Sequence, residues 1–100
     1  MKTKIMILSS LAWEKEGKSS SRIDFILCDK DDFVKSDNFK GYTPVAQYYN
    51  GKKAFDSVLP EMIGQPLDAN LKSIKSFKNP LETKQVIESI IYKDNVINLL

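Results

Sequence analysis

The apolar residues of this sequence occur in short segments, and stretches rich in glycine, serine, asparagine, aspartate or proline separate one segment from the next. The clearest segment is Arg22–Asp29, in which Ile23, Phe25 and Leu27 recur at every second position. A period of two places these three side chains on one face of a β-strand. Because 100 residues supply one hydrophobic core and no second, we expect a single domain over residues 1–100 that is built mainly from strands.

Other segments are also typical of strands, because Ile, Val, Leu and aromatic residues are concentrated in them. They are Thr3–Trp13, Val45–Tyr49, Leu67–Phe77 with a bulge, Gln85–Tyr92, and the terminal run Val96–Leu100 after the turn residues Lys93–Asn95.

The last third of the chain has a helical alternative. Leu67, Leu71 and Ile74 also fit helical spacing, and Asn79–Glu82 resembles the start of a helix. The density of β-branched residues in Gln85–Tyr92 favours the strands, so we take the strand interpretation.

The connections are predicted from their turn residues. Glu14–Ser21 is expected to be a flexible loop, and Asp31–Gly41 a polar stretch with turns. Asn50–Gly51 predicts a type I′ hairpin turn, with Lys52–Phe55 continuing the hairpin. A short helical turn is expected at Val58–Ile63. Five strands, a loop after the first and a helical piece between the third and fourth indicate an all-β fold, a five-stranded OB-type barrel; a small sandwich and an SH3-like barrel remain open.

The composition excludes several kinds of chemistry. The sequence has no histidine and only one cysteine, Cys28, so it cannot form a histidine-based metal site, a Ser-His or Cys-His pair, or an intrachain disulfide. Asp29, Asp31 and Asp32 lack the glycine and glutamate of a calcium loop, and no glycine-rich phosphate motif is present. We therefore expect no enzyme activity, no metal and no cofactor. No apolar run approaches the ~20 residues of a membrane span, so we expect a cytoplasmic protein without a membrane partner.

The net charge of +2 says little, but the distribution of the charges is informative. Between Asp37 and Asp56, and again between Asp68 and Glu82, every charged residue is a lysine. Aromatic residues lie within both lysine blocks. A surface that binds single-stranded nucleic acid needs this combination, because lysines contact the phosphates and aromatic rings stack on the bases. Arg22 is the only arginine among the 15 basic residues, which argues for backbone contact with little sequence specificity.

The candidate nucleic-acid-binding residues fall into two groups. The expected phosphate contacts are Lys15, Lys18, Arg22, Lys52, Lys53, Lys72, Lys75 and Lys78. The expected stacking side chains are Trp13, Tyr48, Tyr49 and Phe77. Tyr48 and Tyr49 are neighbours on a strand and point to opposite faces, so one of them belongs to the core, and the sequence does not say which. Phe25 and Phe55 are interpreted as core residues.

These features resemble the small OB-fold single-stranded DNA-binding proteins of bacteriophages and mobile genetic elements. The residues that carry the resemblance are Leu11–Trp13, the loop Lys15–Arg22, the strand Arg22–Cys28, the run Tyr48–Lys53 and the basic segment Lys72–Lys78. The resemblance implies a non-catalytic protein that coats single-stranded DNA during replication or transfer, often as a homodimer, alongside replication or transfer proteins. Cellular single-strand binding proteins end in an acidic tail, whereas this chain ends in Val96–Leu100, so recruitment by such a tail is not expected.

A second hypothesis is a small protein-interaction module, an accessory subunit or an inhibitor. In that case Trp13, Tyr42, Tyr48 and Tyr49 would be interface anchors, and the acidic segment Asp29–Asp37 would face a basic partner. The apolar C-terminus could supply an edge strand for pairing.

Overall fold

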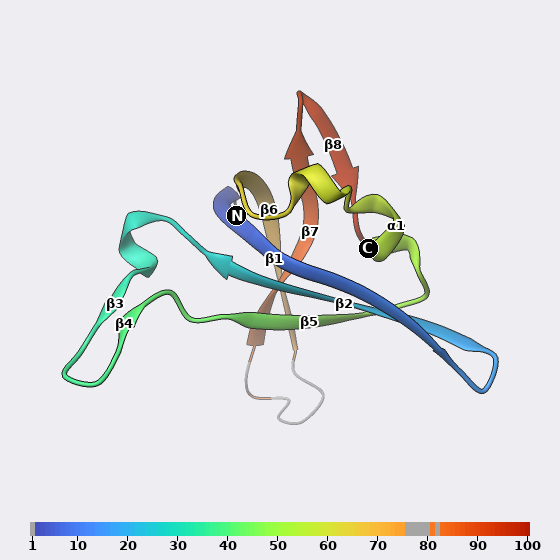
Figure 1. Cartoon of the computed structure of the whole chain (residues 1–100), viewed down its shortest axis with the longest axis horizontal. Helices are drawn as coiled ribbons and strands as arrows, with labels where there is room; N and C mark the ends of the chain where they lie inside the picture. The colour runs from blue at the N-terminus through green and yellow to red at the C-terminus, as the bar shows by residue number, and fades with distance from the viewer. Residues whose placement is uncertain (1, 76–80, 82) are drawn as a thin grey trace.

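The computed structural model describes residues 2–75, 81 and 83–100, without the side chains of residues 83 and 84. The described residues form an all-β fold with one short helix, which confirms that part of the prediction. The main sheet is antiparallel with the strand order β5-β2-β1-β6-β7-β8 (Figure 1). Its strands are β1 Lys2–Lys15, β2 Lys18–Leu27, β5 Val45–Asn50, β6 Pro66–Lys75, β7 Thr83–Tyr92 and β8 Asn95–Asn98.

The remaining elements are short. β3 (Val34–Lys35) and β4 (Lys40–Gly41) form a separate two-stranded hairpin. The helix α1 (Lys53–Ser57) and two 3-10 turns, η1 (Lys30–Asp32) and η2 (Pro60–Met62), complete the described structure. None of the helices in these described ranges is long and apolar enough to cross a membrane.

The first two strands form a long hairpin and not a pair joined by a flexible loop. β1 extends to Lys15 and β2 begins at Lys18, so only Glu16 and Gly17 lie in the turn. Both have positive φ, 54° and 77°, as a type I′ turn requires. The serines expected in a loop, Ser19, Ser20 and Ser21, belong to β2. Ser21 is buried, and its hydroxyl donates to the Gly51 carbonyl at 2.9 Å.

β1 belongs to both halves of the sheet. Its first residues pair with β6, while the stretch from Ile5 onward pairs with β2. The β1–β2 register shifts between Ile7 and Ser9, and such a bulge bends a strand and increases its twist. In Figure 1, β6 and β7 accordingly cross behind β1, β2 and β5.

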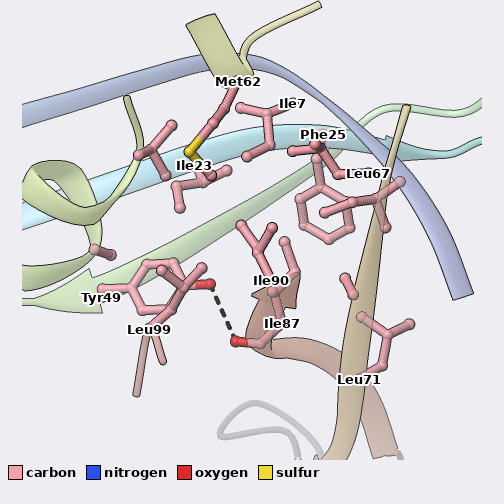
Figure 2. Close-up of a cluster of buried hydrophobic side chains, with 14 residues drawn as sticks. Ile7, Ile23, Phe25, Tyr49, Met62, Leu67, Leu71, Ile87, Ile90 and Leu99 are labelled. Atoms are coloured by element: carbon pink, nitrogen blue, oxygen red, sulfur yellow. Dashed lines mark hydrogen bonds between the residues drawn. The ribbon is translucent and has the colours of Figure 1, made fainter. Parts of the chain in front are cut away.

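The core lies between these two halves (Figure 2). Alternate residues of β1 and β2 face inward, which places Ile5, Ile7, Ile23 and Phe25 in it. The other half and the connection between the halves contribute Met62, Leu67, Ala69, Leu71, Ile87, Ile90 and Leu99. Phe25 is therefore a core residue as predicted, whereas Phe55 is 40% exposed, and its core assignment was wrong because α1 buries Ala54 instead.

Two side chains of β5 join it to β7, where the described residues form no ladder. The Gln47 Oε1 accepts the Ile87 N–H at 2.8 Å, and the Tyr49 hydroxyl donates to the Ile87 carbonyl at 3.4 Å (Figure 2). The backbone N–H and the backbone carbonyl of Ile87 are thus both hydrogen-bonded to buried side chains. We call this contact the seam.

The predicted five-stranded barrel differs from the observed sheet in two respects. The described residues form an open sheet, because side chains take the place of a β5–β7 ladder at the seam. The sheet also has a sixth strand, since β8 pairs with β7 from Ser89 to Tyr92 and continues the sheet.

The prediction of a hairpin turn at Asn50–Gly51 was also wrong. Gly51 has a positive φ of 76°, but its N–H donates to the Ser19 carbonyl at 2.9 Å, and the chain enters α1 two residues later. Lys52–Phe55 therefore does not continue a hairpin. The helical turn expected at Val58–Ile63 is present as η2.

In the last third, the strand interpretation is confirmed for β6 and β7. The bulge in their ladder falls on β7 at Glu88 and not within Leu67–Phe77 as expected, because Asn70 pairs with Ser89 and the next residue, Leu71, pairs with Ile87. The terminal hairpin is confirmed as β7–β8, with positive φ at Lys93 and Asp94. The helix start considered at Asn79–Glu82, and the candidates Phe77 and Lys78, lie outside the described residues.

Replacing Gln47 tests the seam. In a Gln47→Ala variant, the buried Ile87 N–H loses its acceptor, and an unsatisfied buried donor costs about 1–3 kcal/mol. We expect the free energy of unfolding, measured by urea denaturation, to fall by that amount. The matched control is Gln85→Ala, because Gln85 is exposed on β7 and bonds only the Ser73 hydroxyl among the described side chains; its change should stay within about 0.5 kcal/mol. Equal effects of the two substitutions would contradict the seam.

Candidate nucleic-acid interface

The face of β1, β2 and β5 that points away from the core carries the candidate site. Strand alternation fixes this face, because residues paired across an antiparallel ladder share a side of the sheet. Arg22 pairs with Leu11 and Tyr48, Ser20 with Trp13 and Asn50, and Asp24 with Ser9 and Ala46. We call this surface the outer face.

Trp13 and Tyr48 meet on the outer face although they belong to strands that do not pair. Their ring centroids are 6.2 Å apart and the planes are inclined by 83°, an edge-to-face arrangement within the favourable range for aromatic pairs. The small side chain of Ser20, on β2 between them, leaves room for the contact. Tyr48 is 64% exposed and Trp13 is 36% exposed, so both rings keep surface free for a ligand.

Arg22 lies beside the aromatic pair. Its guanidinium carbon is 6.0 Å from the centre of the Tyr48 ring, at the outer limit of a cation–π contact. The pKa of Arg22 is raised above its ordinary value by the Tyr48 side chain and then by Asp24, so the guanidinium carries its charge. A cation is thus fixed next to two exposed rings.

Asp24 holds the arginine in this position. The Arg22 Nη2 donates to Oδ2 of Asp24 at 3.1 Å, and Nε lies 3.1 Å from Oδ1 as an ion pair without hydrogen-bond alignment. The Ser9 hydroxyl donates to the same Oδ2 at 3.0 Å. The carboxylate restricts the guanidinium and also neutralises part of its charge.

Of the two adjacent tyrosines, Tyr48 is exposed and Tyr49 is buried. Tyr49 is 7% exposed, and burial raises the pKa of its phenol well above the ordinary value. The candidate stacking role of Tyr49 was therefore wrong, because its ring fills the core and its hydroxyl belongs to the seam.

The predicted cations do not all gather at the outer face. Lys15 and Lys18 pair directly across the end of the β1–β2 hairpin, two residues beyond Trp13, and both are exposed. Lys53 instead donates to the Leu100 carbonyl at 2.9 Å beside α1, with Lys52 next to it at the start of the helix. Lys72 and Lys75 are exposed on β6, in the other half of the fold. The structure thus brings Trp13, Tyr48, Arg22, Lys15 and Lys18 together.

Some features of the site were missed by sequence reasoning. Ser9 and Asp24 were not singled out, although the alternation of Arg22–Asp29 already placed Asp24 beside Arg22 on the same strand face. The β3–β4 hairpin, in which Phe33 packs edge-to-face on Tyr42 at 5.5 Å between ring centroids, was not predicted either. The polar segment Asp31–Gly41 contains no regular spacing of apolar residues that would indicate strands.

The described residues offer no group of three or more acidic, histidine or cysteine side chains for a metal. The Asp29 carboxylate is occupied by the Thr3 hydroxyl at 2.7 Å and the Lys4 N–H at 3.3 Å, and these bonds lower its pKa. Burial raises the pKa of the Cys28 thiol, which disfavours the reactive thiolate. The chemistry that the outer face supports is stacking and charge pairing.

The sequence matches no protein-family model, and no curated protein or solved structure is significantly similar to it.

The two adjacent tyrosines provide a matched test of the geometry of the outer face. Tyr49→Ala empties a core position and should lower the free energy of unfolding by about 3–5 kcal/mol. Tyr48→Ala removes an exposed ring and should cost less than about 1 kcal/mol. Urea denaturation monitored by circular dichroism measures both. A larger loss from Tyr48→Ala than from Tyr49→Ala would contradict the assignment of the outer face.

Proposed function

We propose that this protein binds single-stranded nucleic acid on the outer face, with little sequence specificity and without catalysis. The observation that carries the proposal is the exposed Trp13–Tyr48 pair beside the charged Arg22. Aromatic rings on a sheet surface stack on unpaired bases, and nearby cations contact the backbone. The fold does not need these rings for its core, since both are at least one-third exposed.

The strand arrangement supports the same proposal. An OB fold is a five-stranded, partly open barrel that binds oligonucleotides on the face of its second and third strands. Here the long strands of the chain, taken in sequence order, are β1, β2, β5, β6 and β7, and the second and third of them are β2 and β5. Tyr48 and Arg22 lie on these two strands. We therefore propose an OB-type barrel that is open at the seam, with β8 added at its far edge.

The mechanism follows from the spacing of the groups. A base that stacks on Tyr48 or Trp13 has its phosphate within reach of Arg22 or of Lys15 and Lys18 at the hairpin end. Duplex bases are already stacked on one another, so they cannot offer their faces to the two rings. The protein would thus coat single-stranded DNA in the cytoplasm during replication or transfer of a phage or mobile element.

The alternative is a protein-interaction module that uses the same aromatic residues. Tyr49 cannot be an anchor of that module because it is buried, which leaves Trp13, Tyr42 and Tyr48. The two proposals differ in their dependence on salt. Phosphate contacts release counterions and weaken steeply as salt rises, whereas an interface of aromatic anchors does not.

Fluorescence anisotropy of a labelled oligo-dT tests the proposal. Three cations lie near the rings, so the slope of log K against log salt should be about −2, and affinity should fall about twentyfold between about 50 and 200 mM salt. A matching duplex should bind much more weakly. The single tryptophan of the chain, Trp13, should be quenched by the single strand as a base stacks on it. No binding at the lower salt concentration would overturn the proposal and favour the interaction module.

The stacking variant Tyr48→Ala should weaken oligo-dT binding by between about fivefold and 150-fold. Tyr92→Ala is the matched control, because Tyr92 is a partly exposed tyrosine of the β7–β8 hairpin, away from the outer face. Equal losses from the two substitutions would contradict a site on the outer face.

Asp24 tests the electrostatic part of the site. Asp24→Asn keeps the shape of the side chain but removes the charge that opposes Arg22. We expect oligo-dT to bind about two- to fivefold more tightly, as the loss of one partly exposed charge pair implies, with a steeper salt slope. Asp68→Asn, which breaks the exposed Lys4–Asp68 pair at 3.2 Å, should leave binding unchanged. Weaker binding by Asp24→Asn would mean that orientation of Arg22 matters more than its charge.

A further inference from the structure

The β3–β4 hairpin and its flanking residues, 33–42, form a projection that we call the arm. Figure 1 shows it standing away from the main sheet at one end of the molecule. Its tip is closed by Ser36, whose N–H donates to the Phe39 carbonyl at 2.7 Å and whose hydroxyl accepts the Phe39 N–H at 3.1 Å. An isolated two-stranded hairpin is marginally stable in water, so the arm gains from packing against another surface.

The arm carries apolar side chains and three charged ones, Lys35, Asp37 and Lys40, which give it a net charge of +1. Phe39 is 44% exposed at the tip, and unlike Phe33, which packs on Tyr42, it has no aromatic neighbour among the described residues. Lys35 and Lys40 lie directly opposite each other in the ladder, an arrangement of like charges that destabilises a hairpin. Neither lysine has an ion pair within the described ranges. The arm thus offers an exposed aromatic ring at its tip, next in sequence to Lys40, and two lysines without an ion pair among the described residues.

A groove with the complementary character lies beside α1. It has a volume of about 420 Å³ and is lined by Ser10, Phe55, Asp56, Val58, Leu59, Pro60 and Ile63. Phe55, Leu59 and Ile63 are exposed although they are large and apolar. The buried Ser10 hydroxyl in the same lining has no hydrogen-bond partner. We call this surface the groove.

The charge of the groove is opposite to that of the arm. Asp56 belongs to its lining, and Glu61 lies on η2 between the lining residues Pro60 and Ile63. Neither carboxylate forms an ion pair in the part of the chain that the structure describes, and no lysine or arginine lines the groove. A ligand that combines an apolar group with flanking cations would match it.

We propose that the groove binds the arm of a second copy of this chain. Phe39 of one copy enters the apolar groove of its neighbour, and Lys35 and Lys40 face Asp56 and Glu61. In Figure 1 the β3–β4 hairpin lies at one end of the long axis and α1 toward the other, so the arm does not meet the groove beside α1 in its own chain. The contact joins different surfaces of two copies, so each pair leaves one arm and one groove free, and further copies can add head to tail. This inference does not require that the protein bind nucleic acid.

Sedimentation velocity over a range of protein concentrations, without nucleic acid, tests the proposal. The wild-type protein should form dimers and then longer species as its concentration rises. Phe39→Asp removes the anchor of the arm, and Ile63→Asp places a charge in the groove, so each variant alone should sediment as a monomer. An equal mixture should form a one-to-one pair and nothing larger, because only the intact arm of Ile63→Asp and the intact groove of Phe39→Asp remain.

A charge exchange repeats the test with little risk to folding. Lys40→Glu and Asp56→Lys should each weaken association, and their mixture should restore it to the wild-type level. Lys2→Glu and Glu14→Lys, exposed positions outside the arm and the groove, are controls with the same charge changes and should associate like the wild type. A wild-type protein that stays monomeric at every concentration would overturn the proposal. Association that survives both Phe39→Asp and Ile63→Asp would also overturn it, and would point instead to pairing through the β8 edge.

Discussion

The fold depends on how β5 is held against β7. No ladder joins these strands among the described residues, and the carboxamide of Gln47 and the phenol of Tyr49 instead pair both peptide groups of Ile87. β8 pairs with β7 only from Ser89 to Tyr92. Without the two side chains, the N–H and the carbonyl of Ile87 would be buried without hydrogen-bond partners, which is costly. The two side chains therefore close the core at the point where the sheet stays open.

The seam also determines what the protein displays. Because side chains alternate along a strand, turning Gln47 and Tyr49 inward places Tyr48 on the opposite side. The β2–β5 register then sets Tyr48 beside Arg22, and the β1–β2 register brings Trp13 across Ser20 toward the same ring. The orientation of β5 therefore determines both the seam in the core and the position of Tyr48 on the outer face. The arm and the groove, through which we propose that copies of the chain associate, lie outside this relation.

Much of the fold could be predicted from local patterns, since alternation and β-branched residues identified the long strands and the terminal hairpin. The site was harder to predict. A period of two is satisfied equally by burying Tyr48 or Tyr49, and the choice is made by Ile87, 38 residues away from Tyr49 in the chain. The Asn50–Gly51 signal was equally local, and the bond from Gly51 to Ser19 overrode it. Contacts between distant segments leave no periodic trace in the sequence.

We propose that the outer face binds single strands. The most direct measurement is a titration of isotope-labelled protein with a short oligo-dT, followed by amide and indole NMR signals. We expect the single indole signal of Trp13 to shift, together with the amide signals of Ser9–Lys15, Lys18–Asp24 and Ala46–Asn50, while the signals of the groove beside α1 stay unchanged. Shifts confined to the groove or to β6–β8, with Trp13 unchanged, would contradict it.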